Sequence, residues 1–214
     1  MPDLKLYYSP NLNPRVAVAV ARHLDSPVAY IAASPMHPDH RRAFKAINPN
    51  TLVPVLVENG TSLWETDAIA CRLSQIAGSD FWPTDERMSE VQMWVSWSNL
   101  HLTRPAGTFY FERLIRPQFS DVPEDPKVMK NDMVTFRNSA GILDALLADR
   151  KWLVADRLSY ADFRTATCLP FAEGAGLPLH EFPNVARWHD QLLAIDAWRD
   201  PFAGIADSVL EMRA

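Results

Sequence analysis

The chain has 214 residues, a formal net charge of −5 at pH 7 and a hydrophobic content of 48%. A chain of this size can bury a substantial core, either as one large domain or as two small ones. Because it carries no concentrated basic tract, the composition argues against a nucleic-acid-binding protein.

The two cysteines, Cys71 and Cys168, are far apart and form neither a CxxC redox pair nor a metal-binding set. We therefore expect both to be buried small side chains, and we expect no metal. The first residues lack the apolar run of a signal peptide, and no stretch reaches the ~18 apolar residues of a membrane span. These features predict a cytoplasmic protein that does not enter a membrane.

The first part of the chain alternates strand-like and helix-like segments. We expect, in order, a strand at 4–8, a helix from 14 to 24, a strand at 28–32, a short helix at 41–47, a hairpin of 53–57 and 62–64, and a helix at 68–76. A strand–helix–strand unit needs a parallel pairing, whereas a hairpin is antiparallel. The order therefore predicts a mixed four-stranded sheet with helices on its faces.

The second part of the chain contains no convincing strand after Glu86. Apolar residues at helical spacing predict helices at 86–115, 125–148, 159–174 and 183–195. Pro105 lies inside the first of these and is expected to kink it. The sequence thus predicts an α/β domain at 1–78, a linker at 79–86 and an all-helical domain at 87–214.

The dipeptide Val53-Pro54 follows a turn and starts a strand. A proline there can hold a cis peptide bond, which would turn the N–H and C=O groups of Val53 away from the sheet. A bound peptide could then pair with that backbone as an additional strand. A plain edge-strand proline is the alternative, and it is the simpler explanation of the dipeptide taken alone.

The tripeptide Glu65-Thr66-Asp67 stands where a helix is expected to begin. The free N–H groups of a helix start attract a carboxylate, and the Thr66 hydroxyl could hydrogen-bond it. Glu65 could pair with an ammonium group, so that the two residues would recognise the α-amino-acid end of a ligand. A helix cap without any ligand is the alternative.

Taken in order, these motifs closely resemble the thioredoxin-like domain of cytosolic glutathione transferases. The family pattern N-P-x-x-x-V-P-x-L stands at 48–56, and E-T-D-A-I stands at 65–69. In the second half, W-L-V-A-D-R-L-S-Y-A-D at 152–162 and F-P-N-V-A-R-W at 182–188 are similar to two further family motifs. The resemblance covers nearly the whole chain.

The resemblance implies a thioredoxin-like domain followed by an all-helical domain, a homodimer and glutathione as co-substrate. It implies that Val53, before a cis Pro54, bonds the cysteinyl backbone of glutathione, and that Glu65 and Thr66 hold its γ-glutamyl end. Ser159, with an aspartate three residues later, forms an S-x-x-D capping box whose role is in folding.

The thiol-activating residue departs from the family pattern. Glutathione transferases stabilise the thiolate with a Tyr, Ser or Cys near the first turn, and neither Cys nor Tyr stands in the usual position here. By similarity to the Thr-Pro-Asn string of bacterial classes that act on glutathione disulfide, Asn11 is the first candidate donor, Ser9 the second and Asn13 the third. Ordinary turn chemistry is the alternative for each residue.

Two other subsites are less defined. Leu52 stands where the family often has a Lys or Gln for the glycine carboxylate, so His40 and Arg41 are the candidate cations, unless they form only a solvated helix end. An apolar acceptor pocket could be lined by the aromatic and histidine side chains of the long helix, which could equally be core or dimer contacts: Trp94, Trp97, His101, Phe109 and Tyr110.

The sequence therefore predicts a glutathione transferase of the detoxification type, which conjugates glutathione to a small apolar electrophile. A glutathione-dependent disulfide or peroxide reductase on the same fold is one alternative, favoured by Ser9-Pro10-Asn11. A non-catalytic glutathione-binding or interaction protein is the other, favoured by Leu12 and Leu52.

Overall fold

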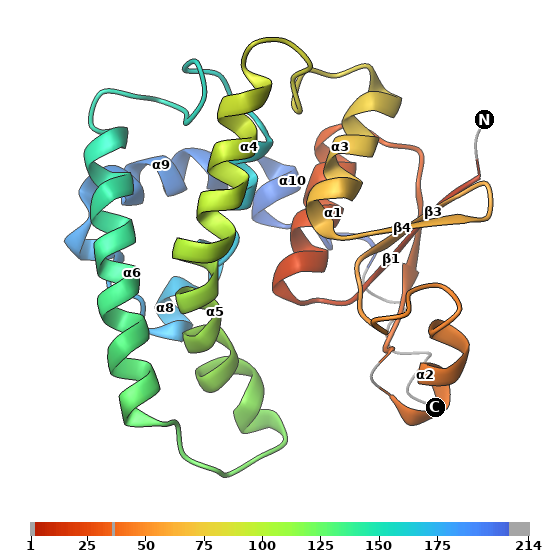
Figure 1. Cartoon of the computed structure of the whole chain (residues 1–214), viewed down its shortest axis with the longest axis horizontal. Helices are drawn as coiled ribbons and strands as arrows, with labels where there is room; N and C mark the ends of the chain where they lie inside the picture. Colours follow the sequence, from red (N-terminus) through yellow and green to blue (C-terminus); the bar gives the residue numbers. More distant parts are fainter. Residues whose placement is uncertain (1–2, 36, 206–214) are drawn as a thin grey trace. The chain divides into compact units, whose positions relative to one another are not determined.

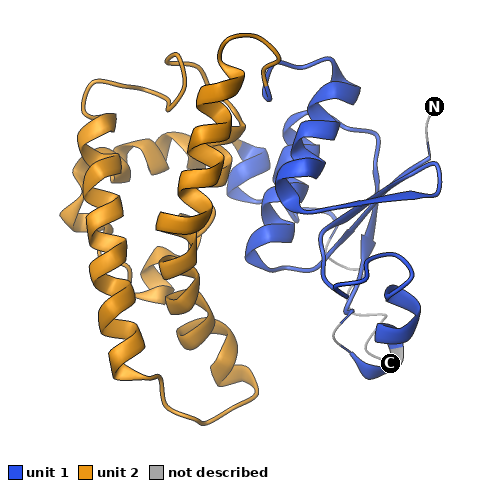
Figure 2. Cartoon of the chain, viewed as in Figure 1, with its two compact units in different colours: residues 1–82, 196–214 blue, residues 83–195 orange. Residues whose placement is uncertain are grey.

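The computed structural model describes residues 3–35 and 37–205, and the chain packs as two compact units (Figure 2). The first unit consists of residues 1–82 with 196–214, and the second of residues 83–195. The domain bounds 1–78, 79–86 and 87–214 remain a prediction, although packing assigns residues 196–205 to the first unit.

The first unit is built on a four-stranded sheet with the order β2-β1-β3-β4. The strands are β1 Leu4–Tyr8, β2 Ala29–Ala32, β3 Val55–Glu58 and β4 Thr61–Trp64. β1 pairs parallel with β2 and antiparallel with β3, and β3 and β4 form an antiparallel hairpin. The predicted mixed four-stranded sheet is confirmed.

Helices cover both faces of this sheet (Figure 1). Helices α1 (Leu12–His23) and α3 (Thr66–Ala77) pack together on one face, and α2 (Pro38–Phe44) lies on the other. β1 alternates accordingly: Leu4, Leu6 and Tyr8 are buried, whereas the residues between them are half-buried.

Helix α1 begins two residues earlier than predicted. The Arg15 N–H donates to the Asn11 carbonyl at 2.8 Å, so that the first turn starts at Leu12. Pro14 therefore lies inside the first turn. The N–H groups of a first turn have no intrahelical acceptor, so the missing N–H of Pro14 costs no helix hydrogen bond.

The second unit consists of helices joined by loops, and its described part has no strand apart from an isolated bridge between Val154 and Arg157. Its elements are α4 Met88–Trp97, η1 Ser98–Thr103, α5 Arg104–Tyr110, η2 Phe111–Ile115, η3 Arg116–Gln118, α6 Pro126–Leu147, α7 Tyr160–Thr165, η4 Leu169–Phe171, α8 Ala172–Ala175, η5 Leu179–Glu181 and α9 Pro183–Leu193. The predicted all-helical domain is confirmed.

The helix expected at 86–115 contains two π-helical segments, η1 and η2. Pro105 follows η1 directly and lies at the second position of α5. A π-helical turn leaves out one regular hydrogen bond, so it accommodates a residue that has no N–H to donate. The distortion predicted at Pro105 is thus a change of helix type on both sides of α5.

The capping box at the start of α7 is present, with Ser159 as its N-cap residue. The fully buried Asp162 carboxylate accepts bonds from the Ser159 N–H at 2.9 Å, the Leu153 N–H at 3.0 Å and the Trp188 Nε1–H at 3.0 Å. Burial raises the pKa of Asp162 to about 6, and these donors oppose the rise. At pH 7 the carboxylate is mainly ionised and joins three separate segments of the second unit.

We expect Asp162→Asn to lower the free energy of unfolding by about 3 kcal/mol, because an amide nitrogen would face N–H donors that now bond an anion. Asp125, the exposed N-cap of α6, offers a matched control. Asp125→Asn should cost less than about 0.5 kcal/mol, since Asn caps a helix as well as Asp does. Urea denaturation measures both variants, and equal losses would contradict the special role of Asp162.

Within the described residues, the chain forms no helix long and apolar enough to cross a lipid bilayer.

Candidate functional site

The strand register brings several predicted site residues to one edge of the sheet. Tyr7 of β1 pairs with Val55, and Val55 pairs with Trp64 of β4. The end of β1, the start of β3 and the end of β4 therefore meet at the same edge. Ser9, Val53 and Glu65 follow or precede those strand ends within two residues, so the fold places them together.

Val53 presents an unpaired backbone at this edge. The Val53-Pro54 peptide bond is cis, as the sequence predicted. Among the residues that the structure describes, none hydrogen-bonds the N–H or the carbonyl of Val53. The Val53 side chain packs against a core cluster that includes Ala33, Phe44 and Val55. The side chain thus anchors the residue while its backbone N–H and C=O stay available for pairing with a ligand.

The loop before Val53 is organised by Asn48, which is buried. Its side-chain nitrogen donates to the Leu52 carbonyl at 2.8 Å, and its side-chain oxygen accepts from the Asn50 N–H at 3.0 Å. The Thr51 N–H donates to the Asn48 carbonyl at 2.9 Å. The Asn-Pro motif therefore holds the loop that leads into Val53, a role of Asn48 that is not among the sequence predictions.

Glu65 has a strained backbone at the start of α3. Its φ of 74° and ψ of 124° lie outside the left-handed helical region that non-glycine residues occasionally occupy. Its carboxylate makes no hydrogen bond or ion pair with another described residue, and it is exposed. Strain of this kind costs about 1–3 kcal/mol and clusters at functional sites.

Thr66 is the first residue of α3 and is only 4% exposed. Its hydroxyl donates to the Asn13 carbonyl at 3.4 Å, so the starts of α1 and α3 lie side by side. The N–H groups in the first turn of each helix have no intrahelical acceptor. Two positive helix ends therefore converge on the edge that holds Val53.

The turn between β1 and α1 holds the candidate thiolate donors. The Asn11 side-chain nitrogen donates to the Ser9 hydroxyl at 3.1 Å, and the Asn11 N–H donates to the Ser9 carbonyl at 2.8 Å. Asn11 and Asn13 are exposed, and Ser9 is half-buried. The hydroxyl of Tyr8, the residue before this turn, donates to the Ile205 carbonyl at 2.6 Å.

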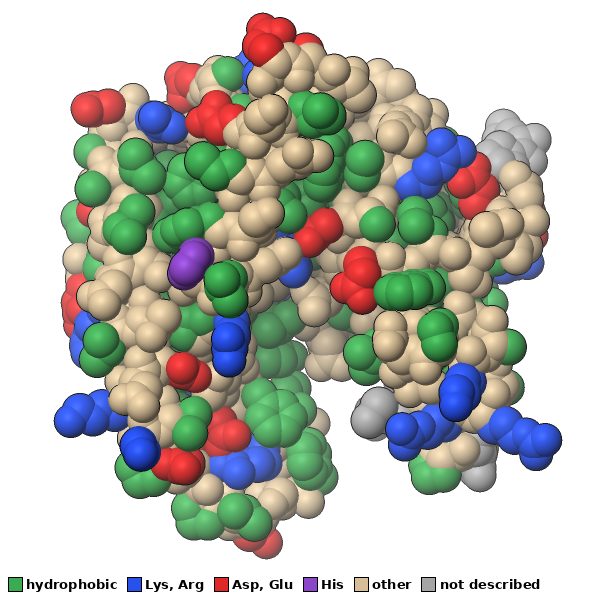
Figure 3. Space-filling view, in the orientation of Figure 1, with side chains coloured by type: hydrophobic (Ala, Val, Ile, Leu, Met, Phe, Trp, Pro, Cys, Tyr) green, Lys and Arg blue, Asp and Glu red, His purple; other side chains and the backbone are tan. Residues whose placement is uncertain are grey.

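The candidate cations for a glycine carboxylate lie on α2. Arg41 is exposed, and Figure 3 shows basic side chains over the region of α2. His40 is half-buried, and its Nδ1 atom is buried without a hydrogen-bond partner among the described residues. It lines an apolar pocket of about 270 Å³ together with Tyr7 and Phe44. His40 thus faces this apolar pocket.

The candidate acceptor residues belong to the second unit. Trp97 is half-buried, and its ring contacts those of Trp94 and His101 at centroid distances of 5.4 Å and 6.0 Å. Trp94, Phe109 and Tyr110 are buried, so they serve the core of that unit. Of the five residues, Trp97 and His101 keep surface that a ligand could contact.

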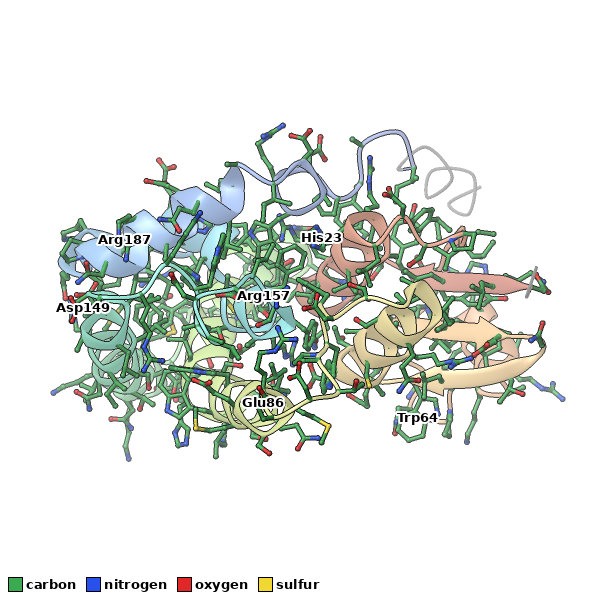
Figure 4. All side chains as sticks on the ribbon, turned by 90° about the horizontal axis from the view of Figure 1, so that it is seen from above. His23, Trp64, Glu86, Asp149, Arg157 and Arg187 are labelled. Atoms are coloured by element: carbon green, nitrogen blue, oxygen red, sulfur yellow. The ribbon has the colours of Figure 1, made fainter. Side chains whose placement is uncertain are left out.

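Two apolar side chains beside the edge are exposed: Leu52 at 53% and Trp64 at 39%. Trp64 ends β4 and lies at the rim of the first unit (Figure 4). Hydropathy gave no reason to expect either exposure. The signal that could have identified them is their position directly before Val53 and before Glu65.

Neither cysteine is suited to thiol chemistry. Cys71 is half-buried and Cys168 is buried. Burial raises the pKa of both thiols, and that of Cys168 reaches about 12. A thiolate is the reactive form, so both side chains are poor nucleophiles. The described residues also contain no group of three or more His, Cys, Asp or Glu side chains that could hold a metal ion.

Comparison with known structures shows the same two-part architecture. Glutathione transferase F7 from Populus trichocarpa is 19% identical with a TM-score of 0.85, covering 94% of this chain and 99% of that one. Human glutathione S-transferase T1-1 is 23% identical with a TM-score of 0.83, covering 96% and 90%. Ure2p in complex with glutathione is 21% identical with a TM-score of 0.79, covering 93% and 98%.

Family comparison agrees with the motifs. Residues 6–80 match the glutathione S-transferase N-terminal domain, and residues 126–191 match the glutathione S-transferase C-terminal domain. Together the two matches cover more than half of the chain, in the order that the motifs predicted. The chain belongs to the glutathione S-transferase family.

Proposed function

We propose that this protein binds glutathione at the sheet edge and transfers it to a small apolar electrophile. The observation that carries the proposal is the unpaired backbone of Val53, which lies beside the first turn of α3. An extended peptide pairs with such a backbone through two hydrogen bonds, as in strand addition. In the proposal, the cysteinyl residue of glutathione occupies that position.

The γ-glutamyl end of glutathione carries an ammonium and a carboxylate group. The exposed Glu65 carboxylate would pair with the ammonium, and the first-turn N–H groups of α3 with the Thr66 hydroxyl would bind the carboxylate. Glu65 has a strained backbone conformation directly before this first turn of α3. This supports a role in binding, because a helix cap needs no such strain.

The turn at Ser9–Asn13 would stabilise the thiolate. A free thiol has a pKa of ~8.5, so most of it is protonated at neutral pH unless donors favour the anion. Asn11 is the proposed donor, with Ser9 and Asn13 as further candidates, and the helix start at Leu12 adds its N–H. The bound thiol would release its proton to solvent. Its sulfur would then bond the electrophilic carbon while the leaving group departs with the bonding electrons.

Two further subsites, for the glycine carboxylate and for the electrophile, complete the proposal. His40 or Arg41 would bind the glycine carboxylate, since Leu52 cannot. Trp97 and His101 would contact the electrophile within the helical unit. We also propose a cytoplasmic homodimer, in keeping with the family.

Two alternatives keep the same binding site. The string Ser9-Pro10-Asn11 favours a glutathione-dependent reductase, but Cys71 and Cys168 are unsuited to a mixed disulfide with the enzyme. Leu12 and Leu52, which cannot donate from their side chains, favour a binding protein without turnover. The substrate range decides among these alternatives.

Substitution of Glu65 should change protein stability and glutathione affinity in opposite directions. We expect Glu65→Gly to raise the free energy of unfolding by about 1 kcal/mol, because glycine relieves a strained φ at a smaller entropic cost. The same substitution should weaken glutathione binding about tenfold or more, since a charged hydrogen bond is lost. Calorimetry measures affinity, and thermal denaturation measures stability.

Two variants control this experiment. Glu65→Gln keeps the backbone strain, so its stability should match the parent while its affinity falls. Ala68→Gly changes a residue with ordinary helical geometry in α3. This substitution should lower the free energy of unfolding by about 1 kcal/mol. If Glu65→Gly binds glutathione as tightly as the parent does, the assigned role of Glu65 is wrong.

The thiolate donor can be tested through the pKa of bound glutathione, followed by the ultraviolet absorbance of the thiolate. We expect Asn11→Ala to raise that pKa by about one unit, which is about 1.4 kcal/mol, and Ser9→Ala to raise it by less. Asn131→Ala, at an exposed position of α6, should leave it unchanged.

Turnover of aryl halides, peroxides and disulfides should be measured for the same variants. Preference for disulfides would identify the reductase alternative, and binding without any turnover would identify the non-catalytic one. If neither Asn11→Ala nor Ser9→Ala changes the thiol pKa or any rate, another group stabilises the thiolate.

A further inference from the structure

The segment Asp196–Ile205, here called the carboxy-terminal strap, lies in the first unit and packs along α1 (Figure 4). It begins with the short helix α10 (Asp196–Arg199). Three side chains from β1 and α1 donate to backbone carbonyls of the strap. The Tyr8 hydroxyl donates to the Ile205 carbonyl at 2.6 Å, and the Arg15 guanidinium donates to the Trp198 carbonyl. The Arg22 guanidinium donates to the carbonyls of Pro201 at 3.2 Å and Ala203 at 2.5 Å.

Aromatic contacts reinforce two of these bonds. The Tyr8 ring stacks on Phe202, with centroids 5.7 Å apart and an interplanar angle of 19°. The Arg15 guanidinium lies 4.6 Å from the ring centre of Trp198, which is fully buried. Burial lowers the pKa of Arg15 to about 10, so the side chain still carries its charge at neutral pH.

Tyr8 and Arg15, here called the two anchors, stand on either side of the proposed thiolate-binding turn. Tyr8 directly precedes Ser9, and the Arg15 N–H donates to the Asn11 carbonyl at 2.8 Å. Between the anchors, the exposed turn has the internal bond from Asn11 to Ser9 as a further constraint. The path of the turn therefore depends on residues that the strap holds from both ends.

We propose that the carboxy-terminal strap positions the thiolate-binding turn, and that Tyr8 and Arg15 are its positioning residues. The inference rests on the proposed function, because it assigns a task to the same turn. A donor must be held to within about 0.5 Å to stabilise a developing or bound anion well. Tyr8 and Arg15 are both buried, stand at the two ends of the turn and bond the strap, so they can hold the turn in that way.

The test compares Tyr8→Phe and Phe202→Leu with the parent, using the full chain. Tyr8→Phe removes the hydrogen bond to Ile205 and keeps the ring, and Phe202→Leu removes the stack from the strap side. Each variant should raise the KM for glutathione about 3- to 10-fold and raise the pKa of the bound thiol, because the donors are displaced from the sulfur. The amides of Asn11, Leu12 and Asn13 should exchange faster in the unliganded protein.

Arg22→Met is the matched control. Arg22 binds the same strap but stands in the last turn of α1, away from the thiolate turn. The Arg22→Met variant should lower the melting temperature as the other variants do. It should leave the KM for glutathione, the pKa of the bound thiol and the amide exchange of the turn unchanged. If Arg22→Met moves these readouts equally, the strap acts through general stability and the inference is overturned.

Unchanged KM and unchanged exchange in Tyr8→Phe and Phe202→Leu would also overturn the inference. If the parent does not bind glutathione, the proposed function fails separately. Amide exchange still decides then whether the strap holds the turn, because that measurement needs no ligand.

Discussion

The unpaired backbone of Val53 is the constraint around which the first unit is arranged. The N–H and C=O groups of Val53 make no hydrogen bond with another described residue, and the neighbouring Pro54 has no N–H to offer another strand. Strand register then determines what surrounds the group, because Val55 pairs with Tyr7 on one side and with Trp64 on the other. The chain therefore leaves β1 and β4 beside Val53, and α1 and α3 both start there.

Backbone strain at this edge differs from the strain in ordinary turns. Asn59 and Gly60 also have positive φ values, of 50° and 82°, but they form the two-residue turn of the β3–β4 hairpin, where such values are required. Glu65 has no turn to satisfy, and its ψ of 124° excludes the left-handed helical well. Packing of α3 against α1 stabilises the unit enough to hold Glu65 in this conformation. The strained backbone of Glu65 thus lowers the stability of the protein at the place where a ligand is proposed to bind.

The sequence predicted the sheet, the capping box and the sheet edge because each depends on local chemistry: alternation, turn formers and helix starts. It did not predict the strap. Asp196–Arg199 is too short for a helical period to be visible, and the burial of Trp198 depends on Arg15, far away in the chain. For the same reason, the pairing of Tyr8 with Ile205 could not be inferred, since composition and spacing carry no signal for a bond between a side chain and a distant carbonyl. The start of α1 at Leu12 was missed because Pro14 is the stronger local signal.

The Leu12 side chain has no donor for a thiolate, but the helix starts offer a physical substitute. Each contributes a partial positive charge of roughly half an elementary charge, and the Thr66–Asn13 contact places the two together. The first turn of α1 contains no acidic residue, whereas that of α3 contains Asp67, which offsets part of its charge. The end of α1 is therefore the more favourable place for an additional anion. A thiolate bound there would depend less on the side chain at position 12 than on how firmly the start of α1 is held, and Arg15 is the residue that links that start to the strap.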